Sequence, residues 1–208
     1  GVDAFSADPD IDPTVRAMAG QAASSLASIP ISAGRTDRQD YDRSAFGSAW
    51  SDAASVPGGG NGCDTRNDVL ARDLHDIRAG PTPSCPRAVL AGELRSPYTG
   101  DFVVFRRDRS ASAVQIDHVV ALSDAWQKGA QQLSAAQRAD FANDPRNLQA
   151  TDGPTNQQKG DGDAATWLPP NRSYRCTYVA RQVEVKAAYQ LWVTQAEKDA
   201  IDLATLRH

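Results

Sequence analysis

The sequence predicts an α+β fold in a single domain over residues 1–208, with a strand–strand–helix unit within residues 113–168 at its centre. Two observations predict this unit: an alternating apolar pattern that ends in an Asp-His pair, and a later extended segment that runs into a helix-capping sequence. Amphipathic helical patterns near both ends of the chain and a strand–turn–strand pattern add surrounding helices and a β-hairpin. Mixed helical and extended segments without a fixed repeat are typical of α+β proteins.

The first strand of the central unit ends in the dipeptide Asp117-His118. Val114 and Ile116 alternate with less apolar neighbours, which is the period of a half-buried strand. We therefore expect Asp117 and His118 to lie where this strand leaves the core, held rigidly at an exposed edge.

The second strand and the helix follow about thirty residues later. Residues 145–151 form a short extended segment, and Asp152-Gly153-Pro154-Thr155 supplies a turn and an N-cap. The helix then carries Asn156 and Lys159, which are three residues apart and share one face.

Residues outside the central unit predict mostly helices. Residues 1–12 form a loose arm, and residues 13–29 repeat apolar side chains at helical spacing behind the N-cap Asp12. A second helix is expected from residue 65 to the Gly80-Pro81 pair, with His75 inside it. A third helix is expected from the N-cap Ser134 to about residue 142. A fourth is expected over residues 179–192, and its apolar face should pack on the back of the core.

A β-hairpin is expected before the central unit. Residues 88–94 and 101–105 read as strands around the turn Ser96-Pro97-Tyr98-Thr99-Gly100. Its strands should join the sheet beside the strand that carries His118.

Arg66 lies in the first turn of the second predicted helix, where a cation opposes the helix dipole. One explanation is that the helix N-terminus and Arg66 together receive a phosphate. The alternative is a salt bridge from Arg66 to Asp64 or Asp68.

The formal net charge of −4 argues against a broad nucleic-acid-binding surface, because Lys and Arg contacts to phosphates supply most non-specific affinity. Nucleic-acid binding would have to use local positive charge. The candidates are Arg66, Arg87, Arg95, Arg106, Arg107, Arg109, Arg146 and Lys159.

Cysteine content and the termini bear on compartment. Three cysteines, Cys63, Cys85 and Cys176, are too few for a disulfide framework. From their spacing alone, all three could be buried free thiols. The first residues lack the charged and apolar regions of a signal peptide, so such a peptide is either lacking or already removed. No apolar run approaches the length of a membrane span.

Several ordered blocks of sequence resemble one family. They are Asn61-Gly62-Cys63-Asp64-Thr65-Arg66-Asn67-Asp68, Pro97-Tyr98-Thr99-Gly100, Asp117-His118-Val119-Val120-Ala121-Leu122-Ser123-Asp124-Ala125-Trp126, Asn143-Asp144-Pro145-Arg146-Asn147-Leu148, Asn156-Gln157-Gln158-Lys159-Gly160-Asp161, Trp167-Leu168-Pro169-Pro170 and Tyr174-Arg175-Cys176-Thr177-Tyr178-Val179. Together they resemble the secreted HNH endonucleases of actinobacteria over residues 40–200. The resemblance implies a ββα-metal core, secretion, and one disulfide bridge whose partners the sequence does not identify.

The resemblance also assigns roles within the site. His118 would be the general base that activates water, and Asn147 would brace the loop that carries it. Asp117 and Asn156 would hold one divalent cation. Lys159 would contact the substrate phosphate or the charge that develops during the reaction, and Arg66 would contact the substrate phosphate. The third position of the family motif is Asn156 and not His, and oxygen ligands favour magnesium, with manganese or calcium as alternatives.

These assignments predict a metal-dependent endonuclease that hydrolyses DNA with little sequence preference. RNA is a further candidate substrate. It would act as a monomer away from membranes, with nucleic acid as its partner. Two alternatives remain: a non-catalytic secreted binding domain on the same scaffold, and a metal-dependent phosphodiesterase with a substrate other than nucleic acid.

Overall fold

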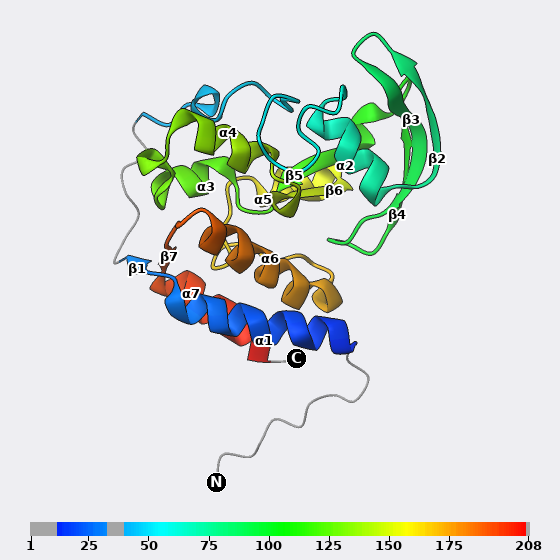
Figure 1. Ribbon diagram of the computed structural model, residues 1–208. Coiled ribbons are helices and arrows are strands. Elements are labelled where there is room, and N and C mark those ends of the chain that lie inside the picture. The colour runs from blue at the N-terminus through cyan, green and yellow to red at the C-terminus, as the bar shows by residue number, and fades with distance from the viewer. Residues whose placement is uncertain (1–11, 33–39, 207–208) are drawn as a thin grey trace.

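A computed structural model of the chain describes residues 12–32 and 40–206 (Figure 1). The expected loose arm lies almost wholly outside this range. In chain order the elements are α1 (Pro13–Ser28), β1 (Ile31–Ser32), η1 (Arg43–Phe46), α2 (Thr65–Asp73), β2 (His75–Thr82), β3 (Cys85–Arg95), β4 (Phe102–Arg106), η2 (Ala111–Ala113), β5 (Val114–His118), α3 (Leu122–Gln127), η3 (Ala130–Gln132), α4 (Ala135–Asn143), η4 (Pro145–Asn147), β6 (Leu148–Asp152), α5 (Gly153–Lys159), η5 (Arg172–Tyr174), α6 (Arg175–Ala188), β7 (Val193–Thr194) and α7 (Gln195–Leu206).

The predicted strand–strand–helix unit is present as β5, β6 and α5. The strands are antiparallel, with Val114 opposite Asp152 and His118 opposite Leu148. The carboxylate of Asp152 accepts a hydrogen bond from the Thr155 amide and so caps α5, as the sequence predicted. The α+β class is confirmed, while the equivalence of this unit to a ββα-metal core stays a prediction.

Helices α1, α6 and α7 form a layer below this unit in Figure 1, with α6 between the unit and the other two helices. Their apolar faces share one buried cluster that includes Leu26, Val183 and Ile201. The sequence predicted α1 and most of α6 from helical spacing, but it made no prediction for α7. Within the described range, none of these helices has the length and apolar character needed to cross a membrane.

The prediction for residues 75–80 was wrong, because they form strand β2 and not the end of a helix. Helix α2 stops at Asp73, and Leu74 turns the chain into an extended conformation with φ −87° and ψ 154°. Strand β2 then pairs with β3 from His75 opposite Glu93 to Thr82 opposite Cys85. Pairing within this local hairpin supplies the backbone partners that a continued helix would have supplied.

The predicted hairpin forms from β3 and β4, but it does not join the sheet of β5. Together with β2 it makes a separate three-stranded antiparallel sheet in the order β2-β3-β4, at one side of the molecule (Figure 1). Its inner face carries the buried Leu94 and Phe105, which share a cluster with Val69 and Leu70 of α2 and with Val114 of β5. Side-chain packing, and not a backbone ladder, therefore joins the hairpin to the central unit.

The expected disulfide bridge joins Cys63 to Cys85, and Cys176 remains a buried free thiol. The bridge closes a loop with a sequence separation of 22 residues between the segment before α2 and the start of β3. It thereby fixes the N-terminal end of α2, where Arg66 lies.

We expect the double variant Cys63→Ser, Cys85→Ser to lose about 3 kcal/mol of folding stability, because a loop of this length is no longer closed in the unfolded chain. Chemical denaturation followed by circular dichroism measures this loss. Cys176→Ser is the control for replacing a thiol that is not bridged. Equal stability of the parent and the double variant would show that the bridge does not constrain the unfolded chain.

Candidate functional site

His118 is the last residue of β5, and two neighbours fix its ring. Its Nε2 lies 2.9 Å from the carbonyl oxygen of Ala142, at the end of α4. Its ring stacks on Trp50 with 5.4 Å between centroids and an interplanar angle of 7°. The ring is therefore held from two directions by segments that are distant from it in the sequence.

These contacts determine the protonation state of His118. Because a carbonyl oxygen only accepts hydrogen bonds, Nε2 carries the proton, and Nδ1 of the neutral ring keeps its lone pair. Burial lowers the pKa of His118 to about 4, and the positive charge of Arg43 adds to this effect. The ring is thus neutral at physiological pH, with Nδ1 able to accept a proton.

Asn147 holds the segment that follows His118. Its side-chain Oδ1 accepts a hydrogen bond of 2.8 Å from the amide of Val120, and its Nδ2 donates one of 3.3 Å to the carbonyl of the same residue. The backbone carbonyl of Asn147 accepts a further bond from the amide of Val119. The side chain is fully buried, so Asn147 lies in the position expected of a brace.

Asp117 and Lys159 form a buried ion pair below the strand. The ammonium of Lys159 lies 3.0 Å and 2.8 Å from the two carboxylate oxygens of Asp117. It also donates to the carbonyl oxygens of His118 at 2.6 Å and Val119 at 3.0 Å. The hydroxyl of Tyr98 donates a third hydrogen bond to the Asp117 carboxylate, at 2.5 Å.

The expected contact between Lys159 and a substrate phosphate is not compatible with this position. The side chain is 0% exposed, and four oxygens of the protein already accept hydrogen bonds from its ammonium. Lys159 and Asn156 share one face of α5, as the spacing predicted, but that face packs against β5 and does not face solvent.

Asn156 contacts the same strand at Gln115, two residues before Asp117. Its Nδ2 donates a hydrogen bond of 2.9 Å to Oε1 of Gln115, which shares a strand face with Asp117. Two residues of α5 thus pair with two alternate residues of β5. The side chains of Asp117 and His118 leave opposite faces of the strand, because β5 keeps its strand geometry up to His118.

A divalent cation does not fit between Asp117 and Asn156 in this arrangement. The ammonium of Lys159 already takes the place of a cation beside both oxygens of Asp117, and Asp117 is only 6% exposed. A second cation there would meet the repulsion of a buried ammonium within about 3 Å. The role of these two residues as metal ligands stays a prediction.

Another acidic cluster, Asp124, Asp163 and Glu197, has carboxylate oxygens within 4.8 Å of one another. The buried Lys128 forms ion pairs with all three. Lys186 lies 2.8 Å from Glu197 as well. Two ammonium groups therefore neutralise most of the charge of this cluster, which joins α3, α6 and α7 and is structural.

Arg66 and Asn156 line one open groove with a volume of about 450 Å³, together with Trp50, Ala111, Gln115 and Ile116. We call this cavity the Arg66 groove. Trp50, which stacks on His118, forms part of its wall. His118 is not among the residues that line the groove; Trp50 is the residue that links its ring to the groove wall.

Within the described part of the chain, the guanidinium of Arg66 forms no salt bridge with Asp64 or Asp68, the two expected carboxylates. Asp64 accepts hydrogen bonds from Asn67, and Asp68 accepts one from Asn61. Arg66 donates instead to the carbonyl of Ala111 at 3.4 Å and lies 5.8 Å from the centre of the Phe105 ring.

Burial and then the positive charge of Arg107 lower the pKa of Arg66. The guanidinium nevertheless keeps its proton, because Arg is not deprotonated in proteins. The negative charge of Asp64 offsets only part of this effect, so the groove keeps a positive charge that favours an anionic ligand.

Other cationic candidates from the sequence differ in availability. Arg146 is paired with Asp144 at 2.7 Å, and Arg107 donates to Asn67 at 2.6 Å and to the carbonyl of Val89 at 3.0 Å. Neither side chain is free to move toward a ligand without breaking these bonds.

Sequence reasoning missed several residues of this site. Trp50 and Arg43 lie in a segment that carries no motif in the sequence, and Ala142 acts through its backbone oxygen alone. Tyr98 was assigned to a hairpin turn. Only Gln115 had a usable signal, because strand alternation places it on the same face as Asp117.

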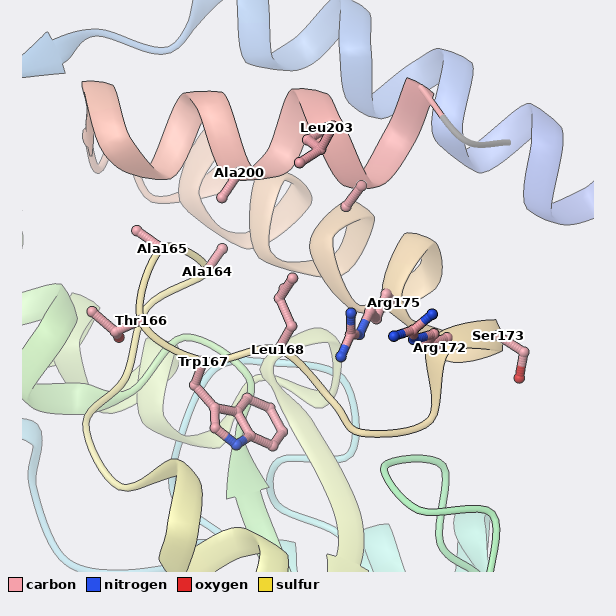
Figure 2. A pocket seen from close by; sticks show the side chains of 11 residues that line it. Ala164, Ala165, Thr166, Trp167, Leu168, Arg172, Ser173, Arg175, Ala200 and Leu203 are labelled. Atoms are coloured by element: carbon pink, nitrogen blue, oxygen red, sulfur yellow. The ribbon is translucent and has the colours of Figure 1, made fainter. Parts of the chain in front are cut away.

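A larger cavity, about 580 Å³, lies elsewhere and is lined by none of the predicted site residues (Figure 2). It opens beneath α7, with Leu203 and Ala200 above Trp167 and Leu168, and with Arg172 and Arg175 at one end. Arg175 is held there by a hydrogen bond of 2.7 Å to the carbonyl of Pro169.

Comparison with known proteins identifies a family. Residues 64–202 match the family model of the GmrSD restriction endonucleases, C-terminal domain. A protein of Arthroderma benhamiae, described as an uncharacterized secreted protein, is 43% identical over 142 residues. This match covers 67% of the present chain and 65% of that protein, so the chain spans slightly less than two thirds of its relative. No solved structure matches the chain.

The matched region contains Arg66, the strand that ends in His118, and helix α5. Because the family model covers more than half of the sequence, the chain belongs to the nuclease family of the GmrSD restriction endonuclease C-terminal domains.

Proposed function

We propose that this protein is an HNH-type endonuclease that hydrolyses phosphodiester bonds of nucleic acid, with His118 as the general base. The observation that carries the proposal is the hydrogen bond between Nε2 of His118 and the carbonyl of Ala142. It makes Nδ1 the basic atom of a neutral imidazole beside a groove that contains an available guanidinium. Membership of a nuclease family supports a nucleic acid as the substrate.

The chemistry needs one water and one phosphodiester. Nδ1 of His118 removes a proton from the water, whose oxygen forms a bond to phosphorus. The bond from phosphorus to the leaving oxygen then breaks, and that oxygen takes a proton from solvent. Arg66 contacts the phosphoryl oxygens and stabilises the negative charge that they carry during the reaction.

Asn147 and Lys159 support this chemistry without contact to the substrate. Asn147 holds the backbone of Val120, and Lys159 holds the carbonyl oxygens of His118 and Val119. Both bonds fix the end of β5, and the orientation of a general base within hydrogen-bonding reach of its water decides its effectiveness.

Substrate range and metal requirement belong to the same proposal. No separate base-reading module was found in the sequence, so we propose that DNA or RNA is cut with little sequence preference. We also propose secretion, since the relative with 43% identity is described as a secreted protein. A plasmid-nicking assay in magnesium, manganese, calcium or EDTA measures the metal requirement and separates a nuclease from a non-catalytic binding domain.

We expect His118→Ala to lower the rate of plasmid cleavage by about 10² to 10⁴, because a general base typically contributes this factor. Nucleic-acid binding, measured by fluorescence anisotropy, should stay within about two-fold of the parent if the base makes little contribution to affinity. Arg172→Ala, in the cavity beneath α7 and away from both His118 and the sheet β2-β3-β4, is the control. Cleavage by His118→Ala within about three-fold of the parent would contradict the assignment, since it falls far below the range for a general base.

The pH profile of the parent is a second readout of the same residue. The folded pKa of about 4 lies below the unperturbed value of about 6.5, so His118 is already a neutral base at pH 5. kcat/KM should therefore rise with pH through an apparent pKa near 4 and stay level up to neutrality. An acid limb near the unperturbed value of about 6.5 would show that the ring is not held as described.

Arg66→Ala should lower kcat/KM by about 10- to 100-fold, the range expected for a hydrogen bond to a charged group. Arg66→Lys should recover only part of this loss, because a forked guanidinium contacts two phosphate oxygens at once. Arg172→Ala, in the cavity beneath α7, is the matched control. Equal kcat/KM for the parent and both Arg66 variants would leave Arg66 with a structural role.

Lys159→Met should lower folding stability by about 3 to 5 kcal/mol, because it leaves the Asp117 carboxylate buried and unpaired. The double variant Asp117→Asn, Lys159→Met should regain part of this stability, since the uncompensated charge is removed. Lys198→Met is the control: it removes a more exposed pair with Asp202 and should cost about 1 kcal/mol or less. Denaturant unfolding of the four proteins measures these differences, and equal losses for Lys159→Met and Lys198→Met would contradict the buried pair.

A further inference from the structure

The outward face of the sheet β2-β3-β4 combines exposed apolar side chains with positive charge. Residues that lie opposite each other in neighbouring strands point to the same side of a sheet. The register pairs Arg95 with Phe102, Glu93 with Val104 and Ala91 with Arg106, and it pairs Arg78 with Ala91 and His75 with Glu93 across the other ladder. We call this set of residues the outer sheet face.

Two large apolar side chains of the outer sheet face are open to solvent. Phe102 is 69% exposed and Val104 is 54% exposed, whereas Phe105, which points inward from the same strand, is 0% exposed. Single exposed apolar residues are common, but an aromatic and an aliphatic side chain two positions apart on one strand face form a contiguous patch. Such a patch indicates that something binds there.

The charge of this face is positive although the protein as a whole is negative. Three arginines, Arg78, Arg95 and Arg106, accompany a single carboxylate, Glu93. Within residues 12–32 and 40–206, none of the three arginines forms an ion pair with a described carboxylate. The guanidinium of Arg95 lies 4.3 Å from the centre of the Phe102 ring, so an aromatic surface and a cation are presented together.

We propose that the outer sheet face binds an unpaired stretch of a nucleic-acid strand, with a base stacked on Phe102 and phosphates at Arg95, Arg106 and Arg78. This proposal rests on the proposed function, whose substrate class it narrows. An exposed aromatic ring beside arginines suits an unpaired strand, because a base offers its flat face for stacking only when it is free of the duplex. In a duplex that face is covered by the neighbouring base pairs.

The outer sheet face also leads toward the Arg66 groove. Strand β4 runs from Phe102 to Arg106, a distance of about 13 Å at 3.3 Å per residue. Residues 107–110 then join it to η2, whose first residue, Ala111, lines the groove. A strand held along β4 would therefore continue toward the groove that contains Arg66.

Binding is measured by fluorescence anisotropy with a labelled single-stranded oligothymidine and with a duplex of the same length. We expect Phe102→Ala to weaken binding of the single strand by about 10-fold, as one lost stacked base does, and to change duplex binding less than about two-fold. Arg106→Ala should also lower the slope of log K against log salt by about 0.7, the value for one single-strand phosphate contact. Leu203→Ala, which removes an exposed apolar side chain of α7, and Arg172→Ala are the controls and should bind as the parent does.

A small substrate separates this surface from the proposed active site. Bis(p-nitrophenyl) phosphate is too short to span both regions, so Phe102→Ala and Arg106→Ala should hydrolyse it at the parental rate, while His118→Ala should not. If the parent hydrolyses neither this compound nor oligonucleotides but its single-strand binding still depends on Phe102, the proposed function fails and the binding surface stands. The proposed surface would be contradicted if Phe102→Ala bound the single strand within two-fold of the parent. It would also be contradicted if this variant lost as much affinity for the duplex as for the single strand.

Discussion

The buried ammonium of Lys159 fixes the end of the strand on which the proposed chemistry depends. It neutralises Asp117 and at the same time donates hydrogen bonds to the carbonyl oxygens of His118 and Val119. A buried charge needs a partner of opposite sign and a full set of hydrogen bonds, and this arrangement supplies both. Helix α5 is thereby attached to β5 at the residue that carries the imidazole, so the position of His118 depends on an ion pair below it.

Because side chains alternate along a strand, the neighbouring residues Asp117 and His118 have different roles. Asp117 points toward α5 and joins the buried ion pair, whereas His118 points away toward Trp50 and Ala142. One side chain of the Asp-His pair therefore stabilises the fold while the other is available for catalysis. The opposite placement also limits the electrostatic effect of Asp117 on the imidazole, since burial dominates and lowers the pKa of His118.

Positive charge is concentrated locally in this acidic protein. The positive charge of Arg107 lowers the pKa of Arg66, and the three arginines of the outer sheet face lack described carboxylate partners. The bridge between Cys63 and Cys85 ties the start of α2 to β3, and so connects the groove with the sheet. Local fields of this kind attract phosphates even when the net charge is negative, because screening in salt removes the influence of distant acidic groups.

The sequence by itself determined the central unit, because its signals are local. Alternation predicted β5, the capping residues predicted α4 and α5, and a spacing of three predicted the common face of Asn156 and Lys159. Pairing in the β2–β3 hairpin overrode the helical pattern of residues 75–80, and tertiary packing decided the separate sheet and the burial of Lys159. This packing also brought Trp50 and the carbonyl of Ala142 to His118. Sequence periodicity cannot predict contacts between segments that are far apart in the chain. Local patterns fix which face a side chain occupies, but only packing between remote segments decides whether that face meets solvent, a cation or another strand.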